Sequence, residues 1–267
     1  MNKHSLKSND YKQSLRSYDL NFAAIILAAG KGKRMNSKTV NKVALSLGGK
    51  PMILHTFGIL EKLEIKTVIV VVGFAKHSVM NLFSGKKVEF CEQKKRLGTA
   101  HAVACAMKKM PSKIKNILIL HGDDSALYKT DTIRNLIEKH LESDASFTFL
   151  TIEMENPQGL GRVIRGKEGK VLAVVEEKDA TPDIRKIKEV NPACYVFKTE
   201  FLRKYLPKIK KSSVTGEYYL PNLIDTGIKS NENIETLQAG LFAWRGVNTK
   251  EELQEAENIF LKIKGKL

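Results

Sequence analysis

A chain of 267 residues, 42% of them hydrophobic, is long enough to bury one large core or two small ones. Its formal net charge of +16 favours anionic partners such as nucleotides, phosphorylated metabolites, nucleic acid or a membrane surface, without choosing among them. The three cysteines, Cys91, Cys105 and Cys194, are far apart and form no CxxC pair. They therefore indicate neither a disulfide framework nor a zinc site, and we expect reduced thiols in a cytoplasmic protein.

The apolar runs and the N-terminal segment of this sequence lead us to expect neither a membrane span nor a signal peptide. No apolar run reaches the roughly 18–20 residues that span a bilayer. Residues 1–20 are polar and lack the apolar core of a signal peptide. We expect a disordered polar tail over 1–20, a single domain over 21–267, and no membrane partner.

Apolar runs typical of buried strands alternate with helical patterns over the first 155 residues. The expected strands lie in 22–29, 67–74, 87–93, 116–124 and 145–154. The expected helices lie in 50–63, 98–110 and 131–143. This alternation predicts an α/β fold with a Rossmann-like mixed, mostly parallel sheet and helices on both faces.

The pattern changes after residue 155. An antiparallel pair is expected over 161–166 and 169–177, followed by an apolar run at 192–197. A helix near 199–209 and a final strand near 233–239 come next, and the last helix begins at Thr249 with a capping box completed by Glu252. We expect a smaller lobe over about 156–230 within one α/β domain.

The first expected strand runs into a loop with two glycines and three cations, in the stretch AAIILAAGKGKRM (23–35). Ligands of open α/β sheets bind beyond the carboxyl ends of the strands. Gly30 and Gly32 can adopt positive φ and expose backbone N–H groups to phosphate oxygens. Met35 stands where a dinucleotide GxGxxG has its third glycine, and no P-loop sequence occurs. The loop alone indicates either a phosphate cradle or an ordinary turn with solvated lysines.

The segment LAAGKGKRM (27–35) closely resembles the LAAGxGxRM signature of the sugar-1-phosphate nucleotidyltransferases. Further segments follow in the order of that family: QKKRLGTAHAV, HGDD, GLGRVIR, GKVLAVVEEKDAT, EVNPACYVF, TGEYYLPNLI and GVN. The resemblance spans about residues 23–257. It is closest to the uridylyltransferase half of the bifunctional N-acetylglucosamine-1-phosphate uridylyltransferase/glucosamine-1-phosphate acetyltransferases. No hexapeptide repeat follows, so we expect no acetyltransferase β-helix.

The resemblance implies a role for individual residues of this sequence. The implied catalytic residues, which bind the triphosphate and the departing pyrophosphate, are Arg34 and Lys42. The implied nucleotide-binding residues are Leu27, Ala28, Ala29, Gly30, Gln93, Gly98 and Thr99, of which Gln93 reads the pyrimidine. The implied Mg²⁺ ligands are Asp123 and Asn248, and the implied sugar-phosphate residues are Gly161, Glu176 and Asn191.

The implied reaction is Mg²⁺-dependent transfer of UMP from UTP to a sugar 1-phosphate, with N-acetylglucosamine 1-phosphate as the expected acceptor and a place in nucleotide-sugar and cell-envelope biosynthesis. One alternative is another sugar or alcohol phosphate with dTTP or CTP. Another is a non-catalytic nucleotide-sugar-binding protein. Nucleic acid is not expected as a specific partner, although the charge permits weak non-specific binding. The sequence leaves the oligomeric state open.

Simpler readings and departures from the family pattern bear on these roles. Asn248 is equally suited to be only a helix-entry residue, and His101 reads as a helix residue with a local hydrogen bond rather than a catalyst. Asn41 stands where the family commonly has proline, so we expect a less rigid loop around Lys42. His121 replaces an aromatic residue.

Overall fold

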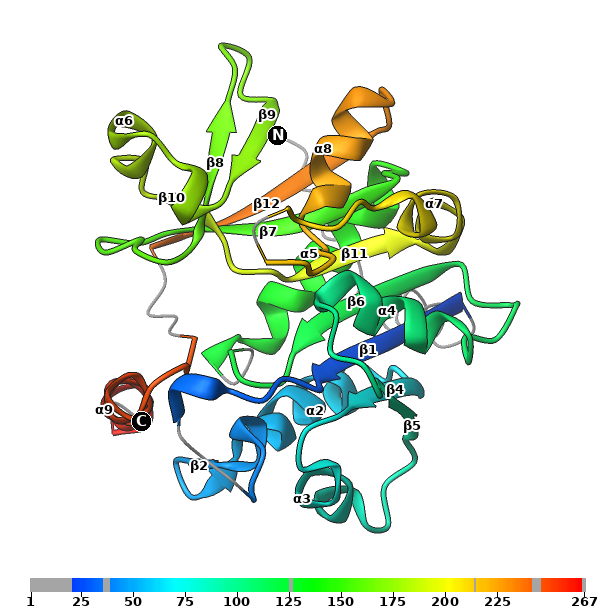
Figure 1. The fold of residues 1–267 in the computed structure, drawn as a ribbon, viewed down its shortest axis with the longest axis vertical. Helices are drawn as coiled ribbons and strands as arrows, with labels where there is room; N and C mark the ends of the chain where they lie inside the picture. Colours follow the sequence, from blue (N-terminus) through cyan, green and yellow to red (C-terminus); the bar gives the residue numbers. More distant parts are fainter. Residues whose placement is uncertain (1–20, 36–38, 125–126, 214, 242–245, 266–267) are drawn as a thin grey trace, which may run out of the picture.

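A ten-stranded mixed sheet crosses the molecule in the order β5-β4-β1-β6-β11-β7-β10-β8-β9, and β12 also pairs with β7 (Figure 1). The computed structural model describes residues 21–35, 39–124, 127–213, 215–241 and 246–265, so the tail expected over residues 1–20 lies outside it. The strands of this sheet are β1 (Phe22–Ala28), β4 (Thr67–Val72), β5 (Glu89–Glu92), β6 (Asn116–His121), β7 (Phe147–Glu153), β8 (Gly161–Arg165), β9 (Val171–Val175), β10 (Glu189–Asn191), β11 (Tyr195–Lys198) and β12 (Ile234–Leu241).

Two kinds of pairing divide the sheet. Strands β5, β4, β1 and β6 are parallel to one another. Beyond β6, β11 runs antiparallel between β6 and β7, and β10, β8 and β9 continue antiparallel to the edge. We call the first group the nucleotide half and the group from β7 to β9 the sugar half, after the roles that the resemblance implies for residues in each part.

Strand β1 lies at the centre of the nucleotide half and is buried on both faces. Phe22, Ala24 and Ile26 belong to the core cluster on one face. Ala23 and Ile25 belong to the cluster on the other. This explains why its sequence is continuously apolar rather than alternating. Each fully buried Ile contributes about 1.5–3 kcal/mol to folding.

Helices cover both faces of the sheet. The α-helices are α2 (Met52–Lys62), α3 (Lys76–Met80), α4 (Thr99–Met107), α5 (Thr130–Glu142), α6 (Pro182–Arg185), α7 (Thr199–Tyr205), α8 (Asn222–Lys229) and α9 (Lys250–Lys264). Short 3₁₀ turns occur at Lys33–Met35, Lys42–Ala44, Asn81–Phe83, Glu177–Asp179 and Leu206–Lys208. Helices α2, α3 and α5 pack on one face, and α4, α7 and α8 pack on the other.

The carboxyl ends of β1, β4 and β6 meet at one edge of the sheet, because Ala28 pairs with Val72 and Leu27 pairs with His121. Helix α9 reaches this edge through a third core cluster, in which Phe260 and Val247 pack with Met35. A two-stranded sheet of β2 (Ser46–Leu47) and β3 (Lys50–Pro51) lies beside α9, where Leu47 joins the same cluster. The end of the chain is thereby held against the loop that follows β1.

The fold class predicted from the sequence is confirmed. Every predicted strand and helix overlaps an observed one, and the capping box of α9 is present. The sequence did not predict α8 or the short elements α3, α6, β2, β3 and β10. Strands β10 and β11, which lie in the expected lobe of 156–230, extend the main sheet, so that lobe has no sheet of its own. No helix in the described ranges is both long enough and apolar enough to cross a membrane.

Candidate active site

The glycine-rich loop leaves β1 at the edge where the strands end. Gly32 has φ +56°, as the sequence suggested, but Gly30 is not in the left-handed region; it is exposed, and a Cβ there would meet nothing within 4 Å. Arg34 is exposed. The loop therefore offers open backbone and a guanidinium to a ligand.

Asn41 anchors this loop to its surroundings. The side chain is 1% exposed, and its Nδ2 donates to the carbonyls of Ala28, Gly30 and Phe74 at 3.0, 3.2 and 2.8 Å. Its backbone N–H donates to Ser78 Oγ at 2.9 Å. The expectation of a less rigid loop at this position is wrong, because the buried amide ties three segments together where a proline would only restrict φ.

Lys42 joins the two residues that the resemblance assigns to a metal. Its ammonium forms an ion pair with Asp123 Oδ2 and donates to Asn248 Oδ1 at 2.9 Å. Burial alone would raise the pKa of the Asp123 carboxyl, but the Lys42 ammonium outweighs it and the pKa is lowered. Asn248 precedes the N-cap Thr249, whose side chain and Glu252 form the capping box that fixes this turn. A carboxylate and an amide oxygen therefore converge on one cation.

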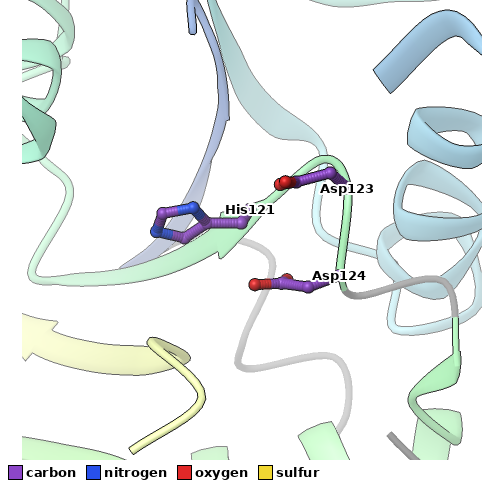
Figure 2. Close-up of side chains that lie close together, drawn as sticks. All are labelled: His121, Asp123 and Asp124. Atoms are coloured by element: carbon purple, nitrogen blue, oxygen red, sulfur yellow. The ribbon is translucent and has the colours of Figure 1, made fainter. Parts of the chain in front are cut away.

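Two further polar residues flank Asp123 (Figure 2). His121 ends β6, Asp124 follows Asp123 in the next turn, and their ligand atoms and that of Asp123 all lie within 4.8 Å of one another. Burial lowers the pKa of His121 despite the neighbouring Asp123 carboxylate. The imidazole is therefore neutral near pH 7 and has a lone pair at one ring nitrogen.

A second wall of the site comes from the start of α4. Gln93 is 4% exposed, and its backbone N–H donates to the Val72 carbonyl at 2.8 Å. Gly98 has φ +98°, and a Cβ there would lie 2.4 Å from the Tyr218 carbonyl oxygen. Thr99 Oγ1 accepts the N–H of Leu220 at 2.9 Å. These contacts fix the backbone beside Gln93.

These parts enclose one cleft of about 680 Å³, which we call the active-site cleft. Of the residues assigned by resemblance, the following line it: Leu27, Ala28, Ala29, Gly30, Arg34, Lys42, Gln93, Gly98, Thr99, Asp123 and Asn248. Gly161, Glu176 and Asn191 do not. Lining residues that the sequence reasoning missed are Arg96 and Glu217. Arg96 lies inside the quoted segment QKKRLGTAHAV, so its position beside Gln93 was the available signal.

The three residues assigned to the sugar phosphate form a second group in the sugar half. Gly161 pairs with Asn191 across β8 and β10, and a Cβ on Gly161 would lie 3.5 Å from Glu176 Oε1. Burial raises the pKa of the Glu176 carboxyl. Asn191 is already bonded, because its Nδ2 donates to Tyr195 Oη at 2.8 Å and its Oδ1 accepts the N–H of Ala193 at 2.9 Å.

Tyr195 links this group to the cleft. Burial raises its pKa, and the Glu176 and Asp124 carboxylates both add to the rise. The tyrosine therefore lies within electrostatic reach of a sugar-side residue and of a residue next to Asp123. Tyr195 also pairs with Ile119 of β6, the strand that ends at His121, so adjacent strands connect the sugar-phosphate group with the edge of the active-site cleft.

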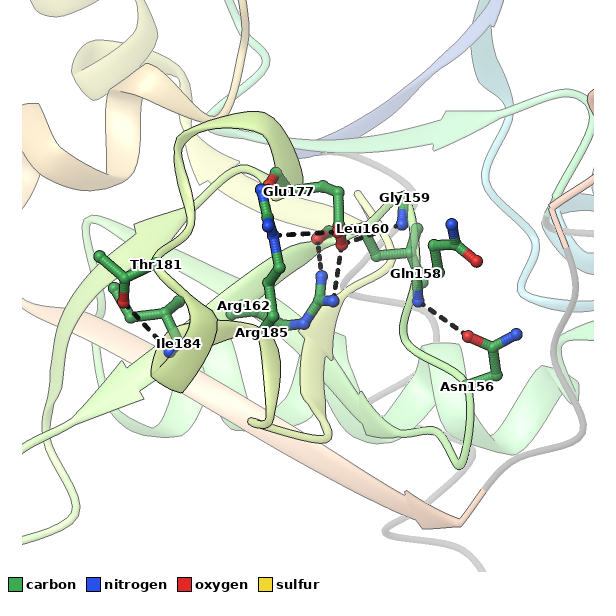
Figure 3. A network of polar contacts seen from close by, with 9 residues as sticks. All are labelled: Asn156, Gln158, Gly159, Leu160, Arg162, Glu177, Thr181, Ile184 and Arg185. Atoms are coloured by element: carbon green, nitrogen blue, oxygen red, sulfur yellow. Dashed lines mark hydrogen bonds and ion pairs between the residues drawn. The ribbon is translucent and has the colours of Figure 1, made fainter.

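An ion pair between the buried Arg162 and the partly exposed Glu177 holds the loop that leads into β8 (Figure 3). Arg162 is 2% exposed; its Nη2 donates to Glu177 Oε2 at 2.6 Å and its Nη1 donates to the Leu160 carbonyl. Gly159 N–H donates to the same Glu177 oxygen at 3.1 Å. Glu177 thus has a structural role, beside the Glu176 that the resemblance selects.

Comparison with known proteins decides the family. A family model described as "Nucleotidyl transferase" matches residues 23–262. The chain belongs to this nucleotidyl transferase family. It shares 41% identity over 235 residues with a "Bifunctional protein GlmU" of Caldicellulosiruptor saccharolyticus, covering 87% of this chain and 50% of the relative. It shares 38% identity over 244 residues with the protein of that name from Exiguobacterium sibiricum, covering 91% and 54%.

The structural comparison agrees with this family. A crystal structure of a putative glucose-1-phosphate thymidylyltransferase from Bacillus anthracis in complex with a sucrose superposes with a TM-score of 0.76. The match covers 89% of this chain and 94% of that one at 20% sequence identity, which supports the fold alone. This nucleotidyl transferase spans about half the length of the curated relatives it matches. The resemblance expected from the sequence is therefore confirmed.

Proposed function

We propose that this nucleotidyl transferase transfers UMP from UTP to a sugar 1-phosphate, with N-acetylglucosamine 1-phosphate as the acceptor, and releases UDP-sugar and pyrophosphate. One observation carries the proposal: the glycine loop, the Gln93 wall and the Lys42–Asp123–Asn248 cluster line a single cleft. The relatives named "Bifunctional protein GlmU" support the choice of substrates.

The donor set of the cleft fits Mg²⁺. The Lys42 ammonium acts as a stand-in cation, because it is held by the carboxylate of Asp123 and the amide oxygen of Asn248. Two protein oxygens, with phosphate and water completing the shell, suit this hard cation. Asp123 and Asn248 would hold Mg²⁺, which supplies charge neutralisation on the phosphates. Lys42 is then free to bind phosphate oxygens.

The remaining chemistry is positioning. A phosphate oxygen of the acceptor attacks the α-phosphorus of UTP, the bond from the α-phosphorus to the bridging oxygen breaks, and pyrophosphate leaves with that oxygen. The attacking group is already anionic, so no side-chain nucleophile is needed. Arg34, Lys42 and the backbone after β1 bind the triphosphate and offset the repulsion between two polyanions. Gly161, Glu176 and Asn191 would orient the sugar.

The second candidate keeps the reaction and changes the substrates. The thymidylyltransferase neighbour favours dTTP with another sugar 1-phosphate, and CTP with an alcohol phosphate belongs to the same class.

The free thiols of Cys91, Cys105 and Cys194 suit a reducing compartment, and we propose a cytoplasmic reaction.

A pyrophosphate-release screen tests both candidates. The purified chain is incubated with UTP, dTTP or CTP and a panel of sugar and alcohol phosphates, with Mg²⁺ and with excess chelator. We expect the highest rate for UTP with N-acetylglucosamine 1-phosphate, and none with chelator. Release with dTTP or CTP, but not with UTP, would establish the second candidate. No release from any pair, with nucleotide binding retained, would establish a non-catalytic nucleotide-binding protein.

A further inference from the structure

Gln93 lines the active-site cleft, and both hydrogens of its side-chain amide have partners. Nε2 donates to the Gly98 carbonyl at 3.0 Å and lies 2.9 Å from His101 Nδ1. A carbonyl oxygen can only accept, so Gly98 determines which end of the amide is the nitrogen. His101 must then accept the second hydrogen through Nδ1.

The surroundings of His101 keep its ring neutral. Burial lowers the pKa of His101, and the Lys108 ammonium lowers it further. The residue is in the first turn of α4, where the helix dipole also disfavours a cation. Cys105 Sγ lies 4.0 Å from both ring nitrogens and brings no charge at neutral pH, because burial raises the pKa of that thiol. With Nδ1 accepting, the ring proton is on Nε2.

We infer that His101 is a positioning residue that sets the nucleobase preference of the cleft by locking the Gln93 amide with only its oxygen available to the base. No other side-chain partner of Gln93 occurs in the described ranges, and Gln93 lines the cleft. This inference rests on the proposed function, since it concerns how the same cleft selects its nucleotide.

Fixing the Gln93 amide in one orientation allows this residue to distinguish between nucleobases. A glutamine that can turn presents either an oxygen acceptor or an NH₂ donor. Held by Gly98 and His101, Gln93 presents Oε1 alone. Uracil and thymine have an N3–H that donates to such an acceptor, whereas cytosine has a bare lone pair at N3. A site built around a matched hydrogen bond discriminates strongly against a base that leaves its group unpaired.

Two substitutions of His101 separate the acceptor from the bulk of the ring. His101→Leu fills the space without an acceptor. His101→Asn places an amide oxygen near the position of Nδ1 and restores the bond to Gln93. The matched control is Cys105→Ala, which alters the packing beside the ring and leaves His101 in place.

The experiment measures UTP and CTP binding by titration calorimetry of the full chain. We expect the native chain to bind UTP more tightly than CTP. The ratio of the two affinities should fall about tenfold in His101→Leu and stay at the native value in His101→Asn and Cys105→Ala. Because both nucleotides are titrated into the same preparation, a fraction of unfolded protein cancels in the ratio. In turnover, the KM for UTP rises in His101→Leu while kcat at saturation is unchanged.

The outcomes separate this inference from the proposed function. A native chain that prefers UTP and a His101→Leu variant with the same ratio would overturn the role of His101 and leave the proposed function standing. A native chain that prefers CTP, or binds no nucleoside triphosphate, would overturn both. A fall of the UTP-to-CTP affinity ratio in His101→Leu, with recovery in His101→Asn, supports the positioning role of His101. A histidine with only a structural role would not change this ratio.

Discussion

The nucleotide half and the sugar half of the sheet differ in how far their polar groups are already engaged. In the nucleotide half, parallel strands end at a cleft of about 680 Å³, and Arg34 and Gly30 are exposed there. In the sugar half, Asn191 is bonded to Tyr195 and Ala193, and Glu177 is bonded to Arg162. Both halves contain polar groups that bond one another, but only the nucleotide half adds an exposed guanidinium and an exposed glycine backbone beside its cleft.

The difference follows from the two kinds of pairing. Parallel strands place their carboxyl ends together, so loops from distant parts of the chain form one rim with open backbone groups. Antiparallel strands β8, β9 and β10 alternate in direction, so their carboxyl ends do not gather at one edge of the sheet. Substitutions in the nucleotide half should therefore change the reaction, and those in the sugar half should change only acceptor binding.

The largest expected effect is that of Asp123→Asn. It removes a carboxylate that converges with Asn248 on one cation and keeps the shape of the side chain. We expect kcat for Mg²⁺-dependent pyrophosphate release to fall by about a thousandfold, the scale of losing a preorganised electrostatic group. The control is Asp131→Asn on α5, where the carboxylate is 78% exposed. Activity within tenfold of the native value would remove Asp123 from the metal site.

Gly98→Ala tests whether the cleft depends on a close backbone approach. The new Cβ would lie 2.4 Å from the Tyr218 carbonyl oxygen at φ +98°. We expect unfolding free energy to fall by about 3 kcal/mol, combining φ strain with a displaced backbone. Gly85→Ala is the matched control, since it has φ +75° and nothing within 4 Å of its Cβ. Urea unfolding of both variants isolates the Tyr218 contact, and equal losses would show that strain alone matters.

Sequence reasoning recovered the nucleotide half more fully than the sugar half for the same physical reason. Strands buried on both faces, such as β1, give continuous apolar runs, and the loop after β1 is marked by glycines. The three-residue strand β10 has one apolar residue, the buried Val190, so its sequence shows no strand pattern. It is recognised as a strand through its pairing with β7 and β8. Helix α8 contains Gly227, a weak helix former that packs against Phe147.

Contacts between residues far apart in the chain could not be predicted from the sequence. In the sequence, Asn41 only marks the absence of a proline that would restrict the backbone, and the fold shows its amide bonded to three backbone carbonyls, two at or just after the end of β1 and one after β4. The bond from Lys42 to Asn248 joins residues 206 positions apart. Individual residue roles came from the resemblance, and the structure adds that the nucleotide set shares one cleft.

Acidification should weaken the packing of α5 against β6 and β7, which belong to different halves of the sheet. His140 on α5 is 1% exposed, and its ring nitrogens lie 3.1 Å from Asn116 Oδ1 on β6 and from Thr148 Oγ1 on β7. Burial lowers its pKa from 6.5 to about 4. The unfolded chain therefore takes up the proton first, so this stabilisation is complete above pH 6.5 and is lost as pH falls towards about 4.

We expect the loss to reach about 2 kcal/mol between about pH 7.5 and about pH 5. His140→Gln, which cannot titrate, should flatten the pH dependence of urea unfolding by about that amount. His77→Gln, at an exposed position on α3, should leave it unchanged. A His140→Gln variant with the native pH dependence would assign the acid sensitivity to other groups.

The smallest expected effect, and the closest test of the difference between the halves, is Glu176→Gln. The carboxyl is beside Gly161 in the sugar half, and burial raises its pKa, so it is a poorly solvated acceptor suited to sugar hydroxyls. Glutamine keeps the shape and weakens that bond. We expect the KM for the acceptor phosphate to rise about tenfold while the KM for UTP stays within about twofold.

Glu168→Gln, with a 79% exposed carboxylate on the turn of the same hairpin, should change neither KM. An equal rise of both KM values in Glu176→Gln would mean that the halves do not act separately. In that case we expect the two halves to be connected through Tyr195, which accepts a hydrogen bond from Asn191 and pairs with Ile119 of β6. Tyr195→Phe would then reproduce the joint rise, because it removes the hydroxyl that Asn191 binds and keeps the ring.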